Sequence, residues 1–336
     1  MKILVIRFSS IGDIVLTTPV FRCLKQQLSD VEIHFVSKIQ FKAVTEANPY
    51  IDYFHYYEGN LSLLIKRLKP ENFDYIIDLH KNFRSYKIRQ ALRTKVLSFK
   101  KLSWQKWLLT RFHINFMPGR HISLRCLDAL APLGVYDDGK GLDYFIPPHA
   151  VIKAGDLPVS HSAGYIAIVI GASYYTKKLP VEKLQQLCSL LNYPIVLVGG
   201  KEDAAIGALV ADIDEIKVYN ACGKFSLHES ADIVRQAHLV ISHDTGLLYI
   251  ACAFQKKVLA VWGGTSPALD VAPFYGTAFN HEQLENLAHN YVVPNLSCQP
   301  CSNFGTRTCP KKHFHCMEWQ DVTKIAADAL ESVSKK

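Results

Sequence analysis

Short apolar runs alternate with helical patterns along the chain. In the first third, apolar runs occur at 1–8, 31–37 and 73–80, and amphipathic stretches at 13–28 and 60–69 separate them. Short apolar runs bounded by turn residues indicate buried strands, and the stretches between them indicate crossover helices. The basic stretch that follows, 81–120, is predicted to be mostly helical. The pattern therefore predicts a parallel sheet with helices on both faces.

The pattern breaks at 146–163, where three prolines occur without sustained periodicity, and then restarts. Strands are predicted at 165–173, 194–200, 215–220, 238–242 and 257–263, with helices between them and a last helix near the C-terminus. We predict an α/β protein of two facing Rossmann-like, doubly wound domains, residues 1–155 and 156–336. Ligands of such sheets bind at the carboxyl ends of the strands, so the loops that follow strands are expected to carry the function.

The loop at 244–246 interrupts the apolar sequence LVISHDTGLLYIACAF (239–254) between a strand and a helix. The first backbone N–H groups of a helix lack internal partners and point outward with the positive end of the macrodipole. Asp244, Thr245 and Gly246 are therefore predicted to border an anion site. The alternative is that Asp244 is an ordinary N-cap residue.

Other loops after strands also carry polar residues. In FSSIGD, Asp13 follows Ser9, Ser10 and Gly12, and its carboxylate either takes a proton from a hydroxyl group or only complements the helix dipole. GASYYTKKLP (171–180) is either a phosphate-binding loop or a solvated one, with the residues Ser173, Thr176 and Lys177.

Two further residues fit nucleotide recognition. Glu202 follows a strand and either accepts hydrogen bonds from a ribose or is a first-turn helix acid, and Phe225 is placed to pack on a base. There is no G-x-G-x-x-G after the first strand and no G-x-x-x-x-G-K-[ST], which argues against a dinucleotide enzyme and a P-loop NTPase.

Positive charge is concentrated in one segment of a chain whose net charge is +8. Residues 81–120 contain eleven Lys and Arg, no Asp or Glu, and several aromatic residues, among them Trp104 and Trp107. This composition favours a polyanionic partner such as an anionic membrane surface, although a solvated basic face is the alternative. No segment reaches about 18 uninterrupted apolar residues and the first residues do not form a signal peptide, so a cytoplasmic protein is expected.

Five segments, in order, resemble the ADP-heptose:lipopolysaccharide heptosyltransferases of glycosyltransferase family 9. They are VIRFSSIGDIVLTTPVFRCLK (5–25), FDYIIDLHKNFRS (73–85), GASYYTKKLP (171–180), CGKFSLHESADIV (222–234) and ISHDTGLLYIACAFQKKVLAVWGGTSP (241–267). The resemblance implies the GT-B architecture and an inverting, metal-independent transfer of a heptose from a nucleotide-diphosphate donor, ADP-heptose, to a lipid A or core acceptor.

The resemblance also implies residue roles. Asp13 is expected to be the general base, and Lys177 to neutralise the diphosphate leaving group. The donor-binding set comprises Ser9, Ser10, Gly12, Ser173, Thr176, Glu202, Phe225, Asp244, Thr245, Gly246 and Tyr249. The acceptor-binding set comprises His80, Lys81, Asn82, Arg84, Arg120 and His121. No cofactor is required for catalysis, and the expected partners are the nucleotide sugar, the acceptor and the inner face of the cytoplasmic membrane, where the protein is peripheral, but no nucleic acid.

One position departs from the family pattern. The family has D-T-G-x-x-H, and Tyr249 stands in place of the histidine. A histidine can carry positive charge to the donor phosphates, whereas tyrosine offers only a neutral hydrogen bond. His243 either compensates for this change or is structural. Two alternatives to the transferase therefore stay open: a nucleotide-sugar epimerase of the same architecture and a non-catalytic sugar-binding relative.

Four of the nine cysteines cluster near the C-terminus: Cys298, Cys301, Cys309 and Cys316. Clustered thiols in a reduced compartment indicate a structural zinc site more readily than disulfides. The spacing is irregular for a zinc ribbon, so both alternatives stay open.

Overall fold

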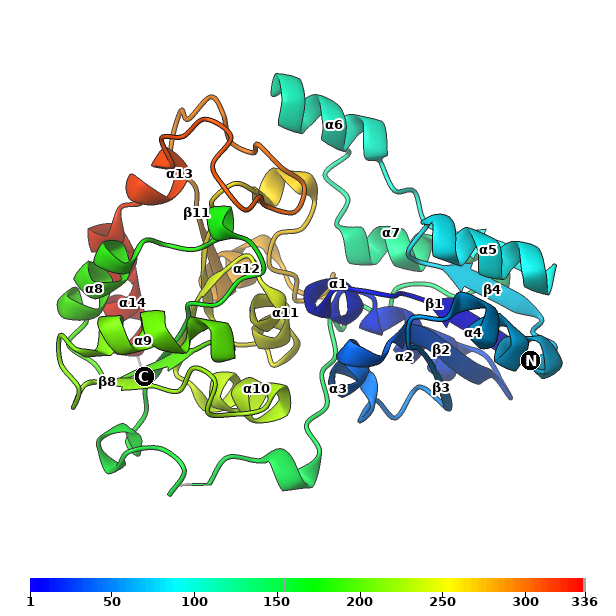
Figure 1. The fold of residues 1–336 in the computed structure, drawn as a ribbon, viewed down its shortest axis with the longest axis horizontal. Helices are drawn as coiled ribbons and strands as arrows, with labels where there is room; N and C mark the ends of the chain where they lie inside the picture. The colour runs from blue at the N-terminus through cyan, green and yellow to red at the C-terminus, as the bar shows by residue number, and fades with distance from the viewer. Residues whose placement is uncertain (154, 335–336) are drawn as a thin grey trace. The chain divides into compact units, whose positions relative to one another are not determined.

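The computed structural model describes residues 1–153 and 155–334, which form two compact units. The first unit comprises Met1–Leu102, Arg120–Phe145 and Gly276–Ala278, and the second comprises Ser103–Gly119, Ile146–Tyr275 and Phe279–Lys336. Each unit is built on its own parallel sheet (Figure 1). The predicted class, two doubly wound α/β domains, is confirmed.

The first sheet has the strand order β3-β2-β1-β4-β5. In that order the strands are Tyr53–Tyr57, Glu32–Lys38, Lys2–Ile6, Tyr75–Asp78 and Lys95–Ser98. The helices of this unit are α1 (Ile11–Val15), α2 (Thr18–Gln27), α3 (Lys42–Thr45), α4 (Leu61–Leu68), α5 (Phe83–Leu92) and α7 (Ile122–Asp128). Side chains of α4 and α5 pack with Leu4, Ile6 and Ile76 on one face of the sheet, while on the other Phe21 of α2 meets Phe35 edge to face.

The second sheet has the strand order β11-β10-β9-β6-β7-β8. In that order the strands are Ala288–Tyr291, Val258–Val261, Leu239–His243, Ile166–Val169, Ile195–Val198 and Val218–Asn220. The helices of this unit are α6 (Ser103–Phe112), α8 (Val181–Leu190), α9 (Ala204–Ala211), α10 (Leu227–Gln236), α11 (Gly246–Ala253), α12 (His281–Leu287), α13 (His315–Glu318) and α14 (Val322–Ser334). Side chains of α8, α9 and α14 pack in one core with the central strands.

The basic stretch differs from its mostly helical prediction. It contains α5, the edge strand β5 and α6, and β5 is mostly exposed because it pairs with β4 on one side only. Pro19 lies in the first turn of α2, where its missing N–H costs no hydrogen bond, and the expected single helix is divided into α1 and α2. No helix among residues 1–153 and 155–334 is both long and apolar enough to span a membrane.

The connection order defines a switch point in each sheet. In the first, the chain runs outward from β1 through β2 to β3 and then crosses to β4, and in the second it runs from β6 to β8 and crosses to β9. At such a point the loops after the two adjacent strands diverge and leave a ligand crevice. The loops after β1 and β4, and those after β6 and β9, are therefore where binding residues are expected.

Candidate functional site

Asp13, in the first turn of α1 after β1, forms an ion pair with Arg7. Arg7 is 7% exposed, and its Nη2 lies 2.6 Å from Asp13 Oδ1. Its Nε donates to the Ser9 carbonyl at 3.0 Å and its Nη1 donates to the Leu79 carbonyl. The sequence analysis did not select Arg7, because an arginine at the end of a strand carries no local signal of its partner.

The Asp13 carboxylate is held ionised by these neighbours. Ser10 donates to Asp13 Oδ2 from its backbone N–H at 3.1 Å and from its hydroxyl at 3.0 Å. Burial raises the pKa of the Asp13 carboxyl, but the Arg7 charge and the Ser10 hydrogen bonds outweigh this effect, and the pKa lies below its ordinary value of 3.8. Ser9 and Gly12 belong to the same turn, so the structure brings all four predicted residues of this loop together.

The loop after β4 is organised by Asp78, which is fully buried. Its Oδ1 accepts the backbone N–H groups of His80 at 3.0 Å and Lys81 at 2.8 Å, and its Oδ2 lies 3.1 Å from Arg89 Nη1. Burial, followed by the Arg7 charge, lowers the pKa of His80 to about 4, so this imidazole is neutral at pH 7. A neutral imidazole can donate and accept hydrogen bonds next to the Asp13 loop.

The other predicted acceptor residues have local partners. Asn82 is the N-cap of α5 and accepts the Ser85 N–H, and the guanidinium of Arg84 lies over the Tyr57 ring at 5.4 Å. Arg120 donates two hydrogen bonds to Asp128, and His121 caps α7. The structure thus gathers the residues after β4, whereas Arg120 and His121 lie at the start of α7 in locally bonded positions.

In the second unit, two residues that follow different strands contact the carboxylate of a third, Asp244. Asp244, after β9, has a side chain that is 9% exposed, and its Oδ2 lies 2.6 Å from Lys177 Nζ. The same oxygen accepts a 2.7 Å hydrogen bond from Thr265 Oγ1, and Thr265 follows β10. Sequence reasoning missed Thr265, and the available signal was its position after the strand next to β9.

The start of α11 keeps N–H groups available to an anion. Thr245 is the N-cap of α11 and makes no side-chain capping hydrogen bond, so Asp244 is not the ordinary N-cap of the alternative interpretation. Gly246 is the first residue of the helix. Free N–H groups, the helix dipole and the Lys177 ammonium together favour a phosphate group at this point.

Tyr249 and His243 are buried next to Asp244. The Tyr249 hydroxyl is 3.3 Å from Asp244 Oδ1 and 2.9 Å from the Val271 carbonyl, and the residue is 4% exposed. The structure therefore places Tyr249 as a support of Asp244. Burial lowers the pKa of His243 to about 4, and its Nε2 accepts the Leu179 N–H at 3.1 Å. His243 is neutral and structural, so it does not replace the positive charge of a histidine at position 249.

The remaining predicted donor-binding residues do not cluster around Asp244. Thr176 is 1% exposed and its hydroxyl is bonded to Thr306, so it faces inward. Ser173 and Glu202 are exposed, and Phe225 is half-buried in the loop before α10. Beside Glu202, Asp203 pairs with Lys178 at 2.5 Å. The adjacent Lys177 and Lys178 therefore pair with different carboxylates.

The four thiols of the cysteine cluster lie near one another: burial, followed by the charges of the neighbouring thiols, raises the pKa values of Cys301 and Cys316, but no three of these sulfur atoms lie within 4.8 Å of one another. Cys298 Sγ lies 3.7 Å from His313 Nε2, and burial raises the pKa of Cys316 to about 12. Within residues 1–153 and 155–334, three potential ligand atoms approach one another within 4.8 Å only at Glu32, His34 and Glu71. There the Lys2 ammonium already lies 3.0 Å from Glu32 and 3.2 Å from Glu71.

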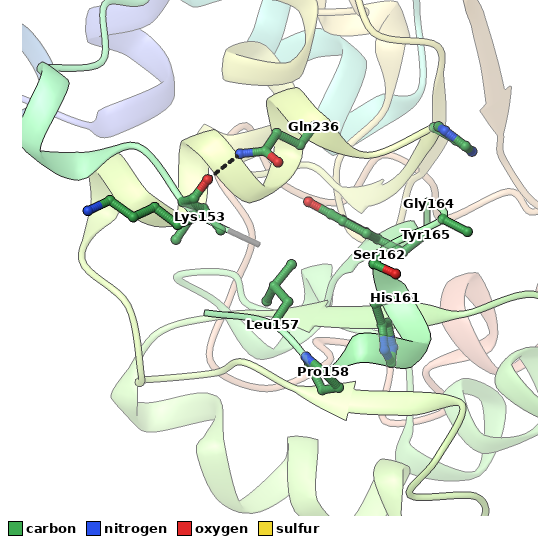
Figure 2. A pocket seen from close by; sticks show the side chains of 11 residues that line it. Lys153, Leu157, Pro158, His161, Ser162, Gly164, Tyr165 and Gln236 are labelled. Atoms are coloured by element: carbon green, nitrogen blue, oxygen red, sulfur yellow. Dashed lines mark hydrogen bonds between the residues drawn. The ribbon is translucent and has the colours of Figure 1, made fainter. Parts of the chain in front are cut away.

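A cavity of about 260 Å³ (Figure 2) is lined by residues that precede β6 and β9, among them Tyr165 and Gln236. Polar atoms around it are bonded within the protein: His161 Nε2 to the Ile195 carbonyl, the Tyr165 hydroxyl to the Ile233 carbonyl, and the Gln236 amide to the Ile152 carbonyl. None of the predicted site residues lines it. The cavity is not part of the site.

Comparison with known proteins identifies the family and the fold. The sequence profile of glycosyltransferase family 9 (heptosyltransferase) matches residues 62–303. The chain is 24% identical to lipopolysaccharide heptosyltransferase 1 of Campylobacter coli, over 98% of both proteins. Its structure resembles ADP-heptose lipopolysaccharide heptosyltransferase II of Escherichia coli (17% identity, TM-score 0.67, 100% of this chain and 98% of the other). It also resembles E. coli heptosyltransferase WaaC solved with ADP-2-deoxy-2-fluoro heptose (19% identity, TM-score 0.66, 88% and 94%).

Proposed function

Because the chain belongs to glycosyltransferase family 9, we propose that it transfers a heptose from ADP-heptose to a lipopolysaccharide core or lipid A acceptor. The observation that carries this proposal is the contact of Lys177 and Thr265 with Asp244 beside the start of α11. It combines a cation and free N–H groups, which suit a diphosphate, with a carboxylate, which suits sugar hydroxyls. The names of the relatives support the choice of sugar and acceptor.

The proposed reaction is an inverting displacement that needs no metal ion. Asp13 removes the proton from the acceptor hydroxyl as its oxygen attacks the anomeric carbon, and the bond from that carbon to the diphosphate oxygen breaks. Lys177 and the N-terminus of α11 stabilise the negative charge that develops on the leaving ADP. Arg7 supports the role of Asp13 because it keeps the carboxylate ionised at neutral pH.

Acceptor recognition is proposed for the loop after β4 and its neighbours. His80, Lys81, Asn82 and Arg84 supply neutral and cationic donors that suit phosphate and hydroxyl groups. Arg120 is proposed as an additional cationic contact for the acceptor. To make this contact it gives up its ion pair with Asp128, which is exposed and therefore weak in water.

The first test is a calorimetric titration of the protein with ADP, UDP, GDP and CDP, repeated with Lys177→Ala. Selective ADP binding that the substitution weakens supports the proposed donor, and absence of binding to all four refutes it. Asp13→Asn separates a transferase from a binding protein. The variant is expected to lose turnover while keeping its affinity for ADP, and unchanged transfer would exclude Asp13 as the base.

We also propose that the protein is cytoplasmic and peripheral on the inner membrane. Helix α6 and the residues that follow it expose four large aromatic side chains, Trp104, Trp107, Phe112 and Phe116. This stretch contains no acidic residues. Aromatic residues beside lysines suit the headgroup region, and each basic residue near an anionic surface adds about 1 kcal/mol of attraction. Flotation with vesicles containing phosphatidylglycerol, compared with pure phosphatidylcholine vesicles, tests this. Equal recovery with both, or no loss with Trp104→Ala/Trp107→Ala, would contradict the proposal.

A structural zinc ion is proposed for the four clustered cysteines. The chemistry of the donor set supports it, because four thiolates complete the tetrahedral coordination that structural zinc prefers. Measurement of the metal content of the purified protein, with Cys309→Ser as the comparison, tests it. Stoichiometric zinc that the substitution removes supports the site, and a disulfide found by mass spectrometry refutes it.

A further inference from the structure

The loop that carries the first cysteines is hydrogen-bonded to the loop that carries Lys177. We define residues 296–308 as the cysteine loop. Its Thr306 N–H donates to the Thr176 hydroxyl at 2.8 Å, and the Thr306 carbonyl accepts the Thr176 N–H and hydroxyl, each at 3.2 Å. Because Thr176 is 1% exposed and directly precedes Lys177, these bonds fix the backbone from which the lysine extends.

The same loop holds the residues after β10 that lead to Thr265. The backbone N–H groups of Cys301 and Ser302 both donate to the Gly264 carbonyl, at 3.0 and 3.1 Å. The side-chain amide of Gln299 donates to the carbonyls of Trp262 at 3.0 Å, Gly263 at 2.7 Å and Thr265 at 3.3 Å. One side chain thus ties three backbone carbonyls within residues 262–265 to the cysteine loop.

The two anchored segments are also bonded to each other and fit without spare room. The Gly264 N–H donates to the Thr176 carbonyl at 2.7 Å. A Cβ atom at Gly264 would lie 2.9 Å from Thr176 Oγ1, and a Cβ atom at Gly305 would lie 3.1 Å from Lys177 Cγ. Gly305 also has a φ of +90°, which favours glycine. A displacement of the cysteine loop therefore displaces both segments.

The geometry points to the cysteine loop as a positioning element of the donor site: through Thr176 and Gln299 it sets Lys177 and Thr265 against Asp244. This inference rests on the proposed function for the identity of the ligand. Thr176 and Gln299 are accordingly positioning residues, and they act on the donor without touching it. Any ligand or modification that shifts the cysteine loop then changes donor affinity from a distance.

The experiment compares Thr176→Val, which keeps the shape of the side chain and removes the hydroxyl, with Thr176→Ser, which restores the hydroxyl. Gln299→Met is the second variant in case the first folds poorly. Ser332→Ala is the matched control, because it removes one side-chain hydrogen bond to a carbonyl of α14 in the same unit. Each variant is measured for ADP affinity by calorimetry, for the KM values of donor and acceptor, and for the acetylation rate of Lys177 relative to exposed Lys324.

We expect Thr176→Val and Gln299→Met to weaken ADP binding and raise the donor KM about tenfold, because the displaced Lys177 and Thr265 then meet the donor in a less favourable position. The acceptor KM stays unchanged, Thr176→Ser stays within about threefold of the original protein, and Ser332→Ala has no effect. Acetylation of Lys177 accelerates in the first two variants only.

Unchanged ADP affinity in folded Thr176→Val and Gln299→Met, with unchanged acetylation of Lys177, overturns the inference. Weakening in Ser332→Ala as well overturns it too, because the effect would then be general. Failure of the original protein to bind ADP refutes the proposed function instead, and the acetylation rates still decide whether the cysteine loop positions Lys177.

Discussion

Two adjacent lysines allow a charge effect on catalysis to be separated from a loss of stability. Lys177 Nζ lies 2.6 Å from Asp244 and Lys178 Nζ lies 2.5 Å from Asp203, and both carboxylates are nearly buried, with side chains 9% and 4% exposed. Lys177→Met and Lys178→Met each leave such a carboxylate without its cation. Breaking a fully buried pair costs about 3–5 kcal/mol.

The cost here is lower, because the Lys177 and Lys178 side chains keep 14% and 30% exposure and each carboxylate retains another donor, the Thr265 hydroxyl or the Gly200 N–H. We expect about 2–4 kcal/mol for Lys177→Met and about 1–3 kcal/mol for Lys178→Met. At roughly 2–4 °C per kcal/mol in a unit of this size, the melting temperature falls by about 4–16 °C in Lys177→Met and by about 2–12 °C in Lys178→Met.

The kinetics should separate the two variants. Removing a cation that stabilises charge in the transition state lowers kcat about 10²–10³-fold, so we expect this loss of kcat in Lys177→Met. Lys178→Met, assayed below its melting temperature, is expected to keep kcat within about threefold of the original protein. Differential scanning calorimetry and a coupled assay of ADP release measure both quantities. Equal losses of kcat in the two variants, or full turnover in Lys177→Met, would refute the assignment of Lys177 to the leaving group.

Two more predictions concern the neighbours of the two carboxylates. Arg7→Met removes the charge that lowers the pKa of Asp13. Because Asp13 acts as a base only when ionised, activity is lost as the pH falls through that pKa. The acid limb of log kcat against pH is therefore expected to move to higher pH in this variant. A pH-rate profile checks this, and an unmoved acid limb would show that Asp13 is not the titrating base. Tyr249→Phe removes the hydroxyl near Asp244 and Val271. It is expected to raise the donor KM about three- to tenfold and to leave the acceptor KM unchanged. Steady-state kinetics with each substrate varied test this, and a rise in both KM values would contradict the assignment of Tyr249 to the donor side.

Most strands that the sequence predicted are central ones with both faces covered, and β8 is the one edge strand among them. β1, β6, β7 and β10 are continuous apolar runs, and a continuous run is the pattern of a central parallel strand. The missed strands β3, β5 and β11 are all at sheet edges and carry polar residues on half-exposed positions. An edge strand of four or five residues does not differ in pattern from a loop.

The sequence could predict the candidate site only from the position of the loops. Asp13, Lys177 and Asp244 were selected because each follows a strand, and the topology puts Asp13 at the switch point of the first sheet and Lys177 and Asp244 at that of the second. Arg7 and Thr265 were not, since their importance lies in contacts with those carboxylates. The inward orientation of Thr176 and Tyr249 was also hidden, because side-chain direction within a loop depends on packing between segments distant in sequence.

The short segment Gly276–Ala278 belongs to the first unit although the chain on both sides of it belongs to the second. Thr277 donates to the Asp137 carboxylate and the Ala278 N–H donates to the Gly139 carbonyl. On the ribosome, which makes the chain from its N-terminus, the amino-terminal unit therefore cannot complete its own contacts until residue 278 has emerged. The two units are expected to mature together during synthesis, and a fragment ending at residue 145 would be released unfinished.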